Sequence, residues 1–419
     1  MDDAGRIVVV GSGHAGFQVA ASLREFGYAG PVTLVGEEPR LPYERPPLSK
    51  SYISGGVAEE TLAFRPRSYY SDKELELFLG DPALEIDRAA GVVHLASGGD
   101  VTYDQLVLAT GARPRRIPIA GSDLDGVVGL QSAADAADLR SRLGSAASIV
   151  VVGGGFIGLE VAATARRFGL EVTVVEALPR LMSRAVSATV SEYYRDQHQA
   201  WGTEILLGSA VEAIGGRNGR ATVVLTSDGR EIPADLVVVG VGVRPNDELA
   251  ERSGLAVGDG VLVDEELTTS DRRISAIGDC ARFPGSWSGQ LERLESVQNA
   301  TDQGRFAAAR LATGAAGPYR QLPWFWSDQG DLKLQIAGIT SGSDQVVLRG
   351  DPTGRSFSAF AFRQGSLLGV ESVNAPMDHL AARLLLDVNR PGVAPLSPDQ
   401  AADPTFDLRA PRRASARAS

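Results

Sequence analysis

The sequence predicts an α/β fold with two doubly wound parallel units, followed by a smaller α+β domain that contains an antiparallel sheet. A strand, a glycine loop, a helix and a second strand follow one another from Arg6, and the same order returns from Ser148. Near the C-terminus, the alternating runs "KLQIAGI" and "SFSAFAF" predict antiparallel strands, and "MDHLAARLLLD" predicts a helix. With 419 residues, 43% of them apolar, the chain can bury two or three cores.

Each copy of the repeat carries a loop that fits the G-x-G-x-x-G pattern, "GSGHAG" in the first and "GGGFIG" in the second. The first glycine permits a tight turn, the second leaves room for a pyrophosphate, and the third lets helix and strand pack closely. The N-terminus of the helix then offers free N–H groups to the phosphates. The six glycines are Gly11, Gly13, Gly16, Gly153, Gly155 and Gly158.

An acid lies about twenty residues beyond each loop, Glu37 in the first copy and Glu176 in the second. Either carboxylate can accept hydrogen bonds from ribose hydroxyls. One glycine loop is weak evidence, but two, each with its strand, helix and acid, predict two Rossmann-like domains that bind two dinucleotides. A chain that holds two dinucleotides is most simply one that moves hydride between them.

Three further strands end in residues suited to a nucleotide site. "LVLATGARPR" and "ADLVVVGVGVRPN" each reach an Arg-Pro pair where a domain crossover is expected to end. "RRISAIGDCARF" ends in Gly278 and Asp279, and a short acid at the carboxyl end of a strand can reach a ribityl hydroxyl. An ordinary turn aspartate is the alternative.

Composition excludes several classes of function. A net charge of -11 argues against nucleic acid as the main partner. The only cysteine, Cys280, permits no internal disulfide and no CxxC site, and we expect it to be a small buried residue. The N-terminal "MDDAG" lacks the features of a signal peptide, so we expect a cytoplasmic protein. The histidines do not have the sequence spacing of a metal-binding site; they are His14, His94, His198 and His379.

With these parts in order, the chain resembles the FAD-dependent pyridine nucleotide oxidoreductases with the glutathione-reductase-like fold. More narrowly, it resembles the putidaredoxin reductase-like ferredoxin reductases of bacterial oxygenase systems. The segments "PPLSK" and "PWFWSDQ" carry the narrower resemblance, while "GSGHAG", "GGGFIGLEVAA", "AIGDCARF" and "ESVQNA" belong to the wider one.

The resemblance implies an NADH:ferredoxin oxidoreductase with FAD and NAD as cofactors. FAD accepts hydride from NADH and passes single electrons to a 2Fe–2S ferredoxin, which supplies a cytochrome P-450 or Rieske-type oxygenase. Disulfide reductases of this fold relay electrons through two cysteines near the first glycine loop, where this chain has "LPYERPPLSK" and no sulfur. The implied domains are FAD-binding at 1–115 and 244–322, NAD-binding at 116–243, C-terminal interface at 323–405 and disordered tail at 406–419.

Lys50 and Glu160 are the two residues that we expect at the reactive centre. The resemblance places Lys50 beside the reactive edge of the flavin, where it can stabilise negative charge and pair with a carboxylate. Glu160 is the expected partner, and it can also orient the nicotinamide amide. A solvated loop lysine and an ordinary helix-face acid are the alternatives.

The resemblance also assigns cofactor contacts to residues around the two loops and in the C-terminal domain. Ser296 and Val297 would lie against the isoalloxazine at the start of a helix. Trp324 and Trp326 are expected on one strand face and Phe325 on the other, with Trp324 in the core and Trp326 near the flavin. The remaining expected contacts are His14, Ala15, Arg45, Ala83, Thr110, Gly111, Gln131, Phe156, Ile157, Arg184 and Gly242.

Glu176 bears on the choice between NADH and NADPH. A carboxylate there favours free ribose hydroxyls and repels a 2′-phosphate, which favours NADH. Arg180 and Arg184 follow closely, however, and a basic side chain can receive that phosphate; Arg184 can instead contact the NADH phosphates.

An acidic chain needs a local basic cluster to attract an acidic iron–sulfur protein. The candidates for docking are Arg65, Arg67, Arg305, Arg310 and Lys333. A rubredoxin reductase, or an NADH oxidase or quinone reductase, is the alternative enzyme. An interaction protein like apoptosis-inducing factor is a remote alternative. The final "RAPRRASARAS" is expected to be disordered.

Overall fold

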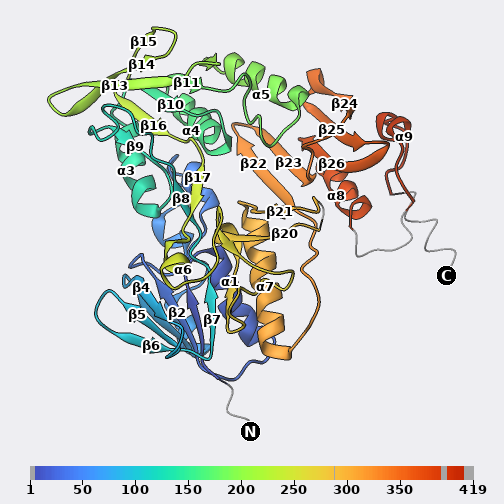
Figure 1. Cartoon of the computed structure of the whole chain (residues 1–419). Coiled ribbons are helices and arrows are strands. Elements are labelled where there is room, and N and C mark those ends of the chain that lie inside the picture. Colours follow the sequence, from blue (N-terminus) through green and yellow to red (C-terminus); the bar gives the residue numbers. More distant parts are fainter. Residues whose placement is uncertain (1–4, 287, 388–393, 410–419) are drawn as a thin grey trace. The chain divides into compact units, whose positions relative to one another are not determined.

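A computed structural model describes residues 5–286, 288–387 and 394–409. The chain, traced in Figure 1, forms two compact units. Unit 1 comprises Met1–Arg45, Glu59–Arg113 and Val243–Gln321, and unit 2 comprises Pro46–Ala58, Pro114–Gly242 and Leu322–Ser419. The segment Pro46–Ala58, which begins with "PPLSK", thus belongs to unit 2. The boundaries given above for the FAD, NAD and C-terminal domains stay predictions.

A five-stranded parallel sheet forms the centre of unit 1, in the order β19-β7-β1-β2-β3. Its strands are β1 (Ile7–Val10), β2 (Val32–Gly36), β3 (Leu75–Leu79), β7 (Gln105–Leu108) and β19 (Ile274–Ala276). β1 is buried throughout, as expected of a β-branched strand covered on both faces. The helices α1 (His14–Glu25) and α7 (Val297–Thr313) pack on each other (Figure 1).

Shorter elements complete unit 1. A three-stranded antiparallel sheet has the order β4-β5-β6. A mixed sheet has the order β18-β20-β21, with β18 parallel to β20 and β20 antiparallel to β21. The bounds are β4 (Ala83–Asp87), β5 (Val92–Leu95), β6 (Asp100–Thr102), β18 (Val261–Leu262), β20 (Ala281–Pro284), β21 (Leu291–Glu292), α2 (Arg67–Asp72), α6 (Glu248–Arg252), η2 (Glu59–Leu62) and η3 (Gly278–Cys280). β8 (Ala112–Pro114) pairs with β17 (Val243–Pro245) where the chain leaves unit 1 and returns to it.

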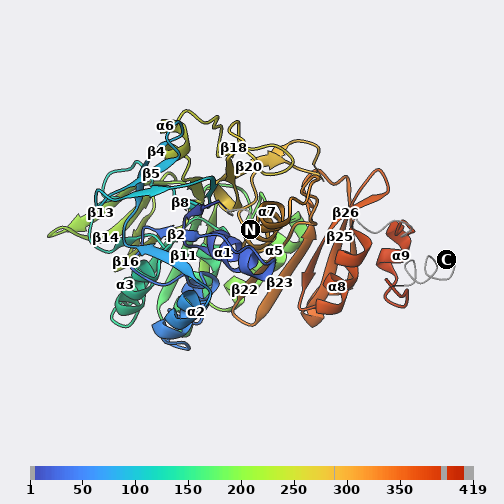
Figure 2. The ribbon, with the colours of Figure 1, turned by 90° about the horizontal axis from the view of Figure 1, so that it is seen from below.

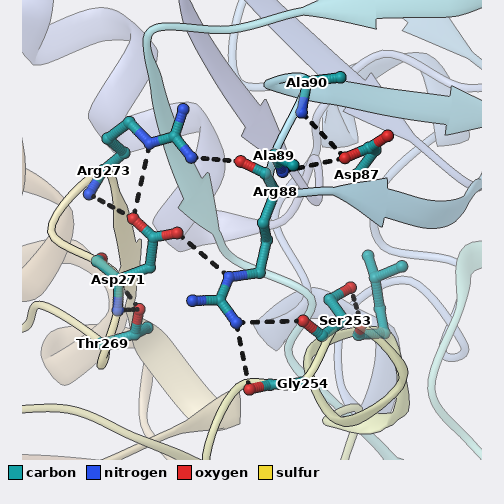
Figure 3. Close-up of polar contacts among 10 residues, drawn as sticks. Asp87, Arg88, Ala89, Ala90, Ser253, Gly254, Thr269, Asp271 and Arg273 are labelled. Carbon is teal, nitrogen blue, oxygen red and sulfur yellow. Dashed lines mark hydrogen bonds and ion pairs between the residues drawn. The ribbon is translucent and has the colours of Figure 1, made fainter.

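An arginine–aspartate cluster fastens the β4–β5–β6 sheet to the loop before β19 (Figure 3). The carboxylate of Asp271 lies 3.1 Å from Arg88 Nε and 3.6 Å from Arg273 Nε. Arg88 also donates to the carbonyl oxygens of Ser253 and Gly254, at 3.3 and 3.2 Å. Arg88 therefore links its own turn to two other segments of unit 1, through Asp271 and through the carbonyl oxygens of Ser253 and Gly254.

Unit 2 repeats the parallel sheet in the order β12-β11-β10-β16-β9. Its elements are β9 (Val127–Val128), β10 (Ser148–Val152), β11 (Glu171–Glu176), β12 (Thr203–Leu207), β16 (Leu236–Val239), α3 (Ala133–Leu143), α4 (Phe156–Arg167) and α5 (Ala188–Ala200). An antiparallel sheet consists of β13 (Val211–Arg217), β14 (Arg220–Thr226) and β15 (Glu231–Pro233). The internal repeat in the sequence is thus a repeat in the fold.

The C-terminal part of unit 2 is a five-stranded antiparallel sheet in the order β22-β23-β26-β25-β24. Figure 2 shows α8 beside β25 and β26. The bounds are β22 (Trp324–Gln329), β23 (Leu332–Gly338), β24 (Gln345–Asp351), β25 (Ser356–Arg363), β26 (Ser366–Val373), α8 (Pro376–Leu385), α9 (Pro398–Ala402), η1 (Pro46–Ser49) and η4 (Pro352–Gly354). The predicted α/β fold with a C-terminal antiparallel sheet is confirmed.

Residues 406–409 of the segment expected to form a tail make contacts in the structure: Arg349 donates to the Phe406 carbonyl at 3.0 Å, and Leu408 is buried. The rest of the expected tail, residues 410–419, lies outside the described residues. Within the described part of the chain, no helix is long and apolar enough to cross a membrane.

Candidate functional site: two nucleotide cradles and a buried ion pair

The first glycine loop has two glycines that the fold requires and one that it does not. A Cβ at Gly11, whose φ is +114°, would lie 2.0 Å from the Ala109 carbonyl oxygen, and one at Gly16 would lie 1.8 Å from the Gly11 oxygen. A Cβ at Gly13 would meet only Arg45 Nε, at 3.9 Å. Because no protein atom crowds Gly13, its missing side chain leaves space for a ligand, as a bound FAD pyrophosphate needs.

Charged groups surround this first cradle. Arg45 reaches the space over Gly13 and pairs with Glu38 at 3.2 Å. Glu37 follows directly after β2, is exposed, and makes no hydrogen bond or ion pair with any residue the structure describes. A carboxylate at this strand end can take ribose hydroxyls.

His14 and Ala15 open α1 beside these groups. The ring of His14 contacts Phe64 edge-on at 4.9 Å. Burial, and secondarily the charge of Arg45, lowers the pKa of His14 to about 4, so the ring is neutral at physiological pH. A neutral ring adds no charge to a site that already holds Arg45.

Asp279 lies in the short helix η3 that follows β19. Burial, reinforced by the negative charge of Glu295, raises the pKa of Asp279 to about 7 against the opposing charges of Arg293 and Arg45. A carboxyl that is partly protonated near neutrality can both donate and accept hydrogen bonds. It is therefore suited to a hydroxyl-bearing chain such as ribityl.

The other residues expected in the FAD site divide between helix starts and strand ends. Ser296 caps α7 by accepting from the Asn299 N–H, and Val297 is the first helical residue, so a helix N-terminus does begin there. Thr110 follows β7 and donates to the Asn246 carbonyl at 2.6 Å. The remaining positions are Gly111, with φ +67°, Gly278, with φ +72°, and Ala83 at the start of β4.

The second glycine loop, in unit 2, has the same build. A Cβ at Gly153, whose φ is +106°, would lie 2.4 Å from the Gly240 oxygen, and one at Gly158 would lie 2.3 Å from the Gly153 oxygen. No atom lies within 4 Å of a Cβ at Gly155. The middle glycine is again free of protein contacts, so this loop also has room for a pyrophosphate.

Glu176 ends β11 and turns toward this loop. Its carboxylate accepts from the Gly154 N–H at 2.6 Å and from the Leu178 N–H at 2.8 Å. Arg180 donates to the carbonyl oxygens of Val186 and Ser183, both at 2.8 Å. The guanidinium of Arg180 is thus committed to the backbone of its own loop.

Arg184 has a different environment from Arg180. It is exposed, forms no ion pair with a described residue, and lies 3.9 Å from a Cβ built on Gly242. It also lines a pocket of about 320 Å³ between residues 180–188 and 340–346. An exposed cation near Gly242, which follows β16, suits the phosphates of NADH.

Aromatic residues pack where α4 meets β22, inside unit 2. Phe156 at the start of α4 lies 4.4 Å from the ring of Phe325. The ring centroids of Trp324 and Trp326 lie 5.5 Å apart, which confirms that the two tryptophans share one strand face.

Two other residues expected to contact a cofactor lie on or before helices of unit 2. Ile157 of α4 is exposed, and the Gln131 N–H, just before α3, donates to the Asp135 carboxylate.

The expected pair of Lys50 and Glu160 is present. Lys50 Nζ lies 2.9 Å from Glu160 Oε2, and the Glu160 side chain is 5% exposed. Ser49 Oγ donates to the same carboxylate oxygen, and Ser327 Oγ donates to Oε1 at 2.6 Å. Ser49 and Ser327 were not among the residues predicted for this site. The alternation in "PWFWSDQ" was the available signal, because it puts Ser327 on the face opposite the tryptophans.

The structure also shows the surroundings of the single cysteine and of the possible metal ligands among the described residues. Cys280 is fully buried, and burial raises the pKa of its thiol, so it is poorly suited to act as a nucleophile. No group of three or more His, Cys, Asp or Glu residues among those described is arranged to hold a metal ion.

The basic residues proposed for docking differ in their exposure and in the contacts that their side chains already make. Arg310 donates to the buried Ser275 hydroxyl at 2.6 Å, and Arg305 pairs with Glu25 at 2.8 Å. Arg65 lies over the Tyr69 ring at 5.7 Å, and Arg67 is exposed at the start of α2. Lys333 is exposed in unit 2. The Arg310 guanidinium is therefore already hydrogen-bonded within unit 1.

Comparison with known proteins agrees with this arrangement. Residues 5–304 match the family "Pyridine nucleotide-disulphide oxidoreductase", and residues 324–411 match "Reductase C-terminal". The chain belongs to the pyridine nucleotide-disulphide oxidoreductase family. It is an FAD-dependent oxidoreductase that also uses a nicotinamide nucleotide.

Several relatives match over nearly the whole chain. Rhodocoxin reductase of Rhodococcus erythropolis is 51% identical over 403 residues, covering 96% of this chain and 93% of the relative. The ferredoxin reductase for the CYP199A2 system from Rhodopseudomonas palustris is 48% identical, with a TM-score of 0.94 over 98% of this chain and 99% of that one. The reductase in the covalent putidaredoxin reductase–putidaredoxin complex is 36% identical, with a TM-score of 0.94 over 99% of this chain and 100% of that one.

Proposed function

We propose that this protein is an NADH-dependent ferredoxin reductase that supplies electrons to a 2Fe–2S ferredoxin of a cytochrome P-450 or Rieske-type oxygenase system. The observation that carries the proposal is the pair of like-built cradles in a chain whose single cysteine is buried. FAD supplies the chemistry, since it accepts hydride and can release single electrons. The relatives named for rhodocoxin, terpredoxin and putidaredoxin support the choice of partner.

The protein's own residues then have defined tasks. The first cradle holds FAD through Gly13, Arg45 and Glu37, and the second holds NADH through Gly155 and Glu176. The Lys50–Glu160 pair orients the reacting groups and balances charge near the flavin. Glu176 favours NADH, and the commitment of Arg180 to carbonyl oxygens leaves it unavailable for a 2′-phosphate. A single buried cysteine is compatible with the reducing cytoplasm, where we place the reaction.

Docking of the ferredoxin is part of the proposal. We assign it to the exposed cations Arg65, Arg67 and Lys333, with Arg305 in a secondary role because it is paired with Glu25. Arg310, which is anchored to Ser275, then contributes little.

Rubredoxin reduction is the second candidate, because rubredoxin-NAD(+) reductase of Pseudomonas putida is 39% identical over 370 residues. Anaerobic stopped-flow experiments test both. The NADH-reduced protein is mixed with a 2Fe–2S ferredoxin or with a rubredoxin, and acceptor reduction is followed by absorbance. We expect faster reduction of the ferredoxin. Faster reduction of rubredoxin would replace the first proposal with the second, and failure with both acceptors would contradict both.

A further inference from the structure

Glu160 stands at one end of a buried polar chain inside unit 2. Ser327 Oγ contacts Glu160 Oε1 at 2.6 Å, Gln329 Nε2 contacts Ser327 Oγ at 3.2 Å, and His198 Nε2 contacts Gln329 Oε1 at 2.9 Å. Ser327, Gln329 and His198 are each fully buried. Four polar side chains from α4, β22 and α5 therefore connect without solvent.

The charge of Glu160 dictates the direction of every hydrogen bond in this chain. A carboxylate paired with Lys50 can only accept, so the Ser327 hydroxyl donates to it. Having given its proton, Ser327 accepts from the Gln329 amide nitrogen, which leaves the amide oxygen to accept from His198 Nε2–H.

His198 is then neutral, with its proton on Nε2. Burial lowers the pKa of His198 to about 4, which agrees with a neutral ring. Its Nδ1 has no hydrogen-bond partner among the described residues, as expected of a bare lone pair facing apolar packing. The Gln329 amide is also held by a 3.7 Å contact to Met182 Sδ.

We propose that His198, Gln329 and Ser327 are positioning residues, which form a directional chain of donors that holds the Glu160 carboxylate aimed at Lys50. Hydrogen bonds that all point toward one charge polarise each other, and the effect is greater in a low-dielectric interior. The consequence for hydride transfer rests on the proposed function. The hydrogen-bond chain itself does not.

Other groups near the Glu160 carboxylate complete its surroundings. Lys50 is the cation in contact with it, and Ser49 adds a second hydroxyl donor. Tyr194 of α5 is buried within electrostatic range of Glu160, as well as of Tyr193 and Asp328, and these acids raise its pKa further after burial itself. Tyr194 is therefore neutral, and Lys50 and the donor chain are left to stabilise the carboxylate.

Ser327→Ala, compared with Ser358→Ala, tests the proposal. Ser358 is equally buried in β25 of the same sheet and donates to the Asp378 carboxylate at 2.9 Å, so both variants lose a hydroxyl-to-carboxylate bond. The Glu160 carboxylate is followed in the FAD-loaded protein by its infrared stretching band, which Glu160→Gln assigns by removing it. We expect Ser327→Ala to shift this band, Gln329→Met to shift it by less, Ser327→Thr to restore it, and Ser358→Ala to leave it in place.

Hydride transfer gives the second readout. The rate of flavin reduction by NADH should fall about tenfold in Ser327→Ala and stay at the wild-type value in Ser358→Ala, because only the first variant disturbs the orientation of Glu160. An identical carboxylate band in Ser327→Ala, Gln329→Met and the wild-type protein would overturn the proposal. If NADH fails to reduce the wild-type flavin, the proposed function fails, while the infrared band still decides the inference.

Discussion

The two cradles have the same backbone arrangement, but the glycine and the larger side chain exchange places between the loop and the strand end. Val10 pairs with Val35 in the first sheet and Val152 with Val175 in the second, so Gly36 and Glu176 occupy equivalent places at the strand ends. In the first cradle the loop holds a serine and the strand ends in glycine, whose Cβ would lie 2.5 Å from Ser12 Oγ. In the second, the loop holds Gly154 and the strand ends in an acid.

The different positions of the small residue explain why the carboxylate is held in the second cradle and exposed in the first. A Cβ at Gly154 would lie 3.2 Å from Glu176 Oε2 and 2.6 Å from Leu181 Cδ2, so the glycine makes room for the carboxylate. The loop N–H then fixes that carboxylate before any ligand arrives. In the first cradle the acid, Glu37, comes one position later and is exposed. If the two acids bind ribose as proposed, the acceptor of the second cradle is held in place before the ligand binds, whereas that of the first is not.

The largest expected effect separates the glycines that the fold requires from those that the ligand requires. Gly16→Ala should destabilise the protein by about 3 kcal/mol or more, because the new Cβ meets a backbone oxygen. Gly13→Ala should change stability by less than about 1 kcal/mol and instead lower the amount of FAD retained. Denaturant unfolding of the FAD-free protein and the flavin content after gel filtration measure the two effects. Equal unfolding midpoints for the two variants would refute the assignment.

The next effect concerns Asp279, which only the first cradle has. Its folded pKa of about 7 lies above its ordinary value of 3.8, so the ionised form destabilises the fold above neutrality, and this penalty disappears as pH falls from 7 to 4. Asp279→Asn should therefore stabilise the FAD-free protein at pH 8, by up to about 4 kcal/mol, and lose this advantage near pH 4. Unfolding curves at several pH values test it. A constant difference between the two proteins would contradict the shift.

A third experiment moves the serine of one cradle into the other. Gly154→Ser should displace the Glu176 carboxylate and raise the KM for NADH about tenfold, since a hydrogen bond to a charged group is lost. FAD content should not change. Ser12→Gly is the matched control in the first cradle and should leave the KM for NADH as it is. An unchanged KM in Gly154→Ser would show that the carboxylate needs no space from Gly154.

The smallest effect separates the two arginines of the second cradle. Arg184→Ala should raise the KM for NADH roughly threefold, because an exposed phosphate contact is weak. Arg180→Ala should instead lower the unfolding temperature and leave the ratio of NADH to NADPH use unchanged. Steady-state kinetics with both nucleotides provide the measurement. A fall in NADPH use on removing Arg180 would show that its guanidinium does reach the 2′-phosphate.

The sequence was sufficient for the parallel units, because β-branched runs and G-x-G-x-x-G loops specify them within some thirty residues. It also predicted α8, β23 and β25 by periodicity. The ion pair of Lys50 and Glu160 came from family resemblance. Ser327 could be placed on a strand face, but not against Glu160, which is 167 positions away. The role of Arg180 was equally hidden, since nothing local tells whether a guanidinium turns to its own loop or to a ligand.

The most direct test of the central claim removes the last sulfur that could take part in a thiol relay. The FAD-loaded Cys280→Ala protein is titrated anaerobically with NADH and then mixed with a 2Fe–2S ferredoxin. If electrons pass directly from the flavin to the ferredoxin, NADH should bleach the flavin absorbance fully, and the ferredoxin should be reduced at the wild-type rate. A variant that binds FAD but cannot pass its electrons on, or a wild-type flavin that NADH does not bleach, would contradict the account.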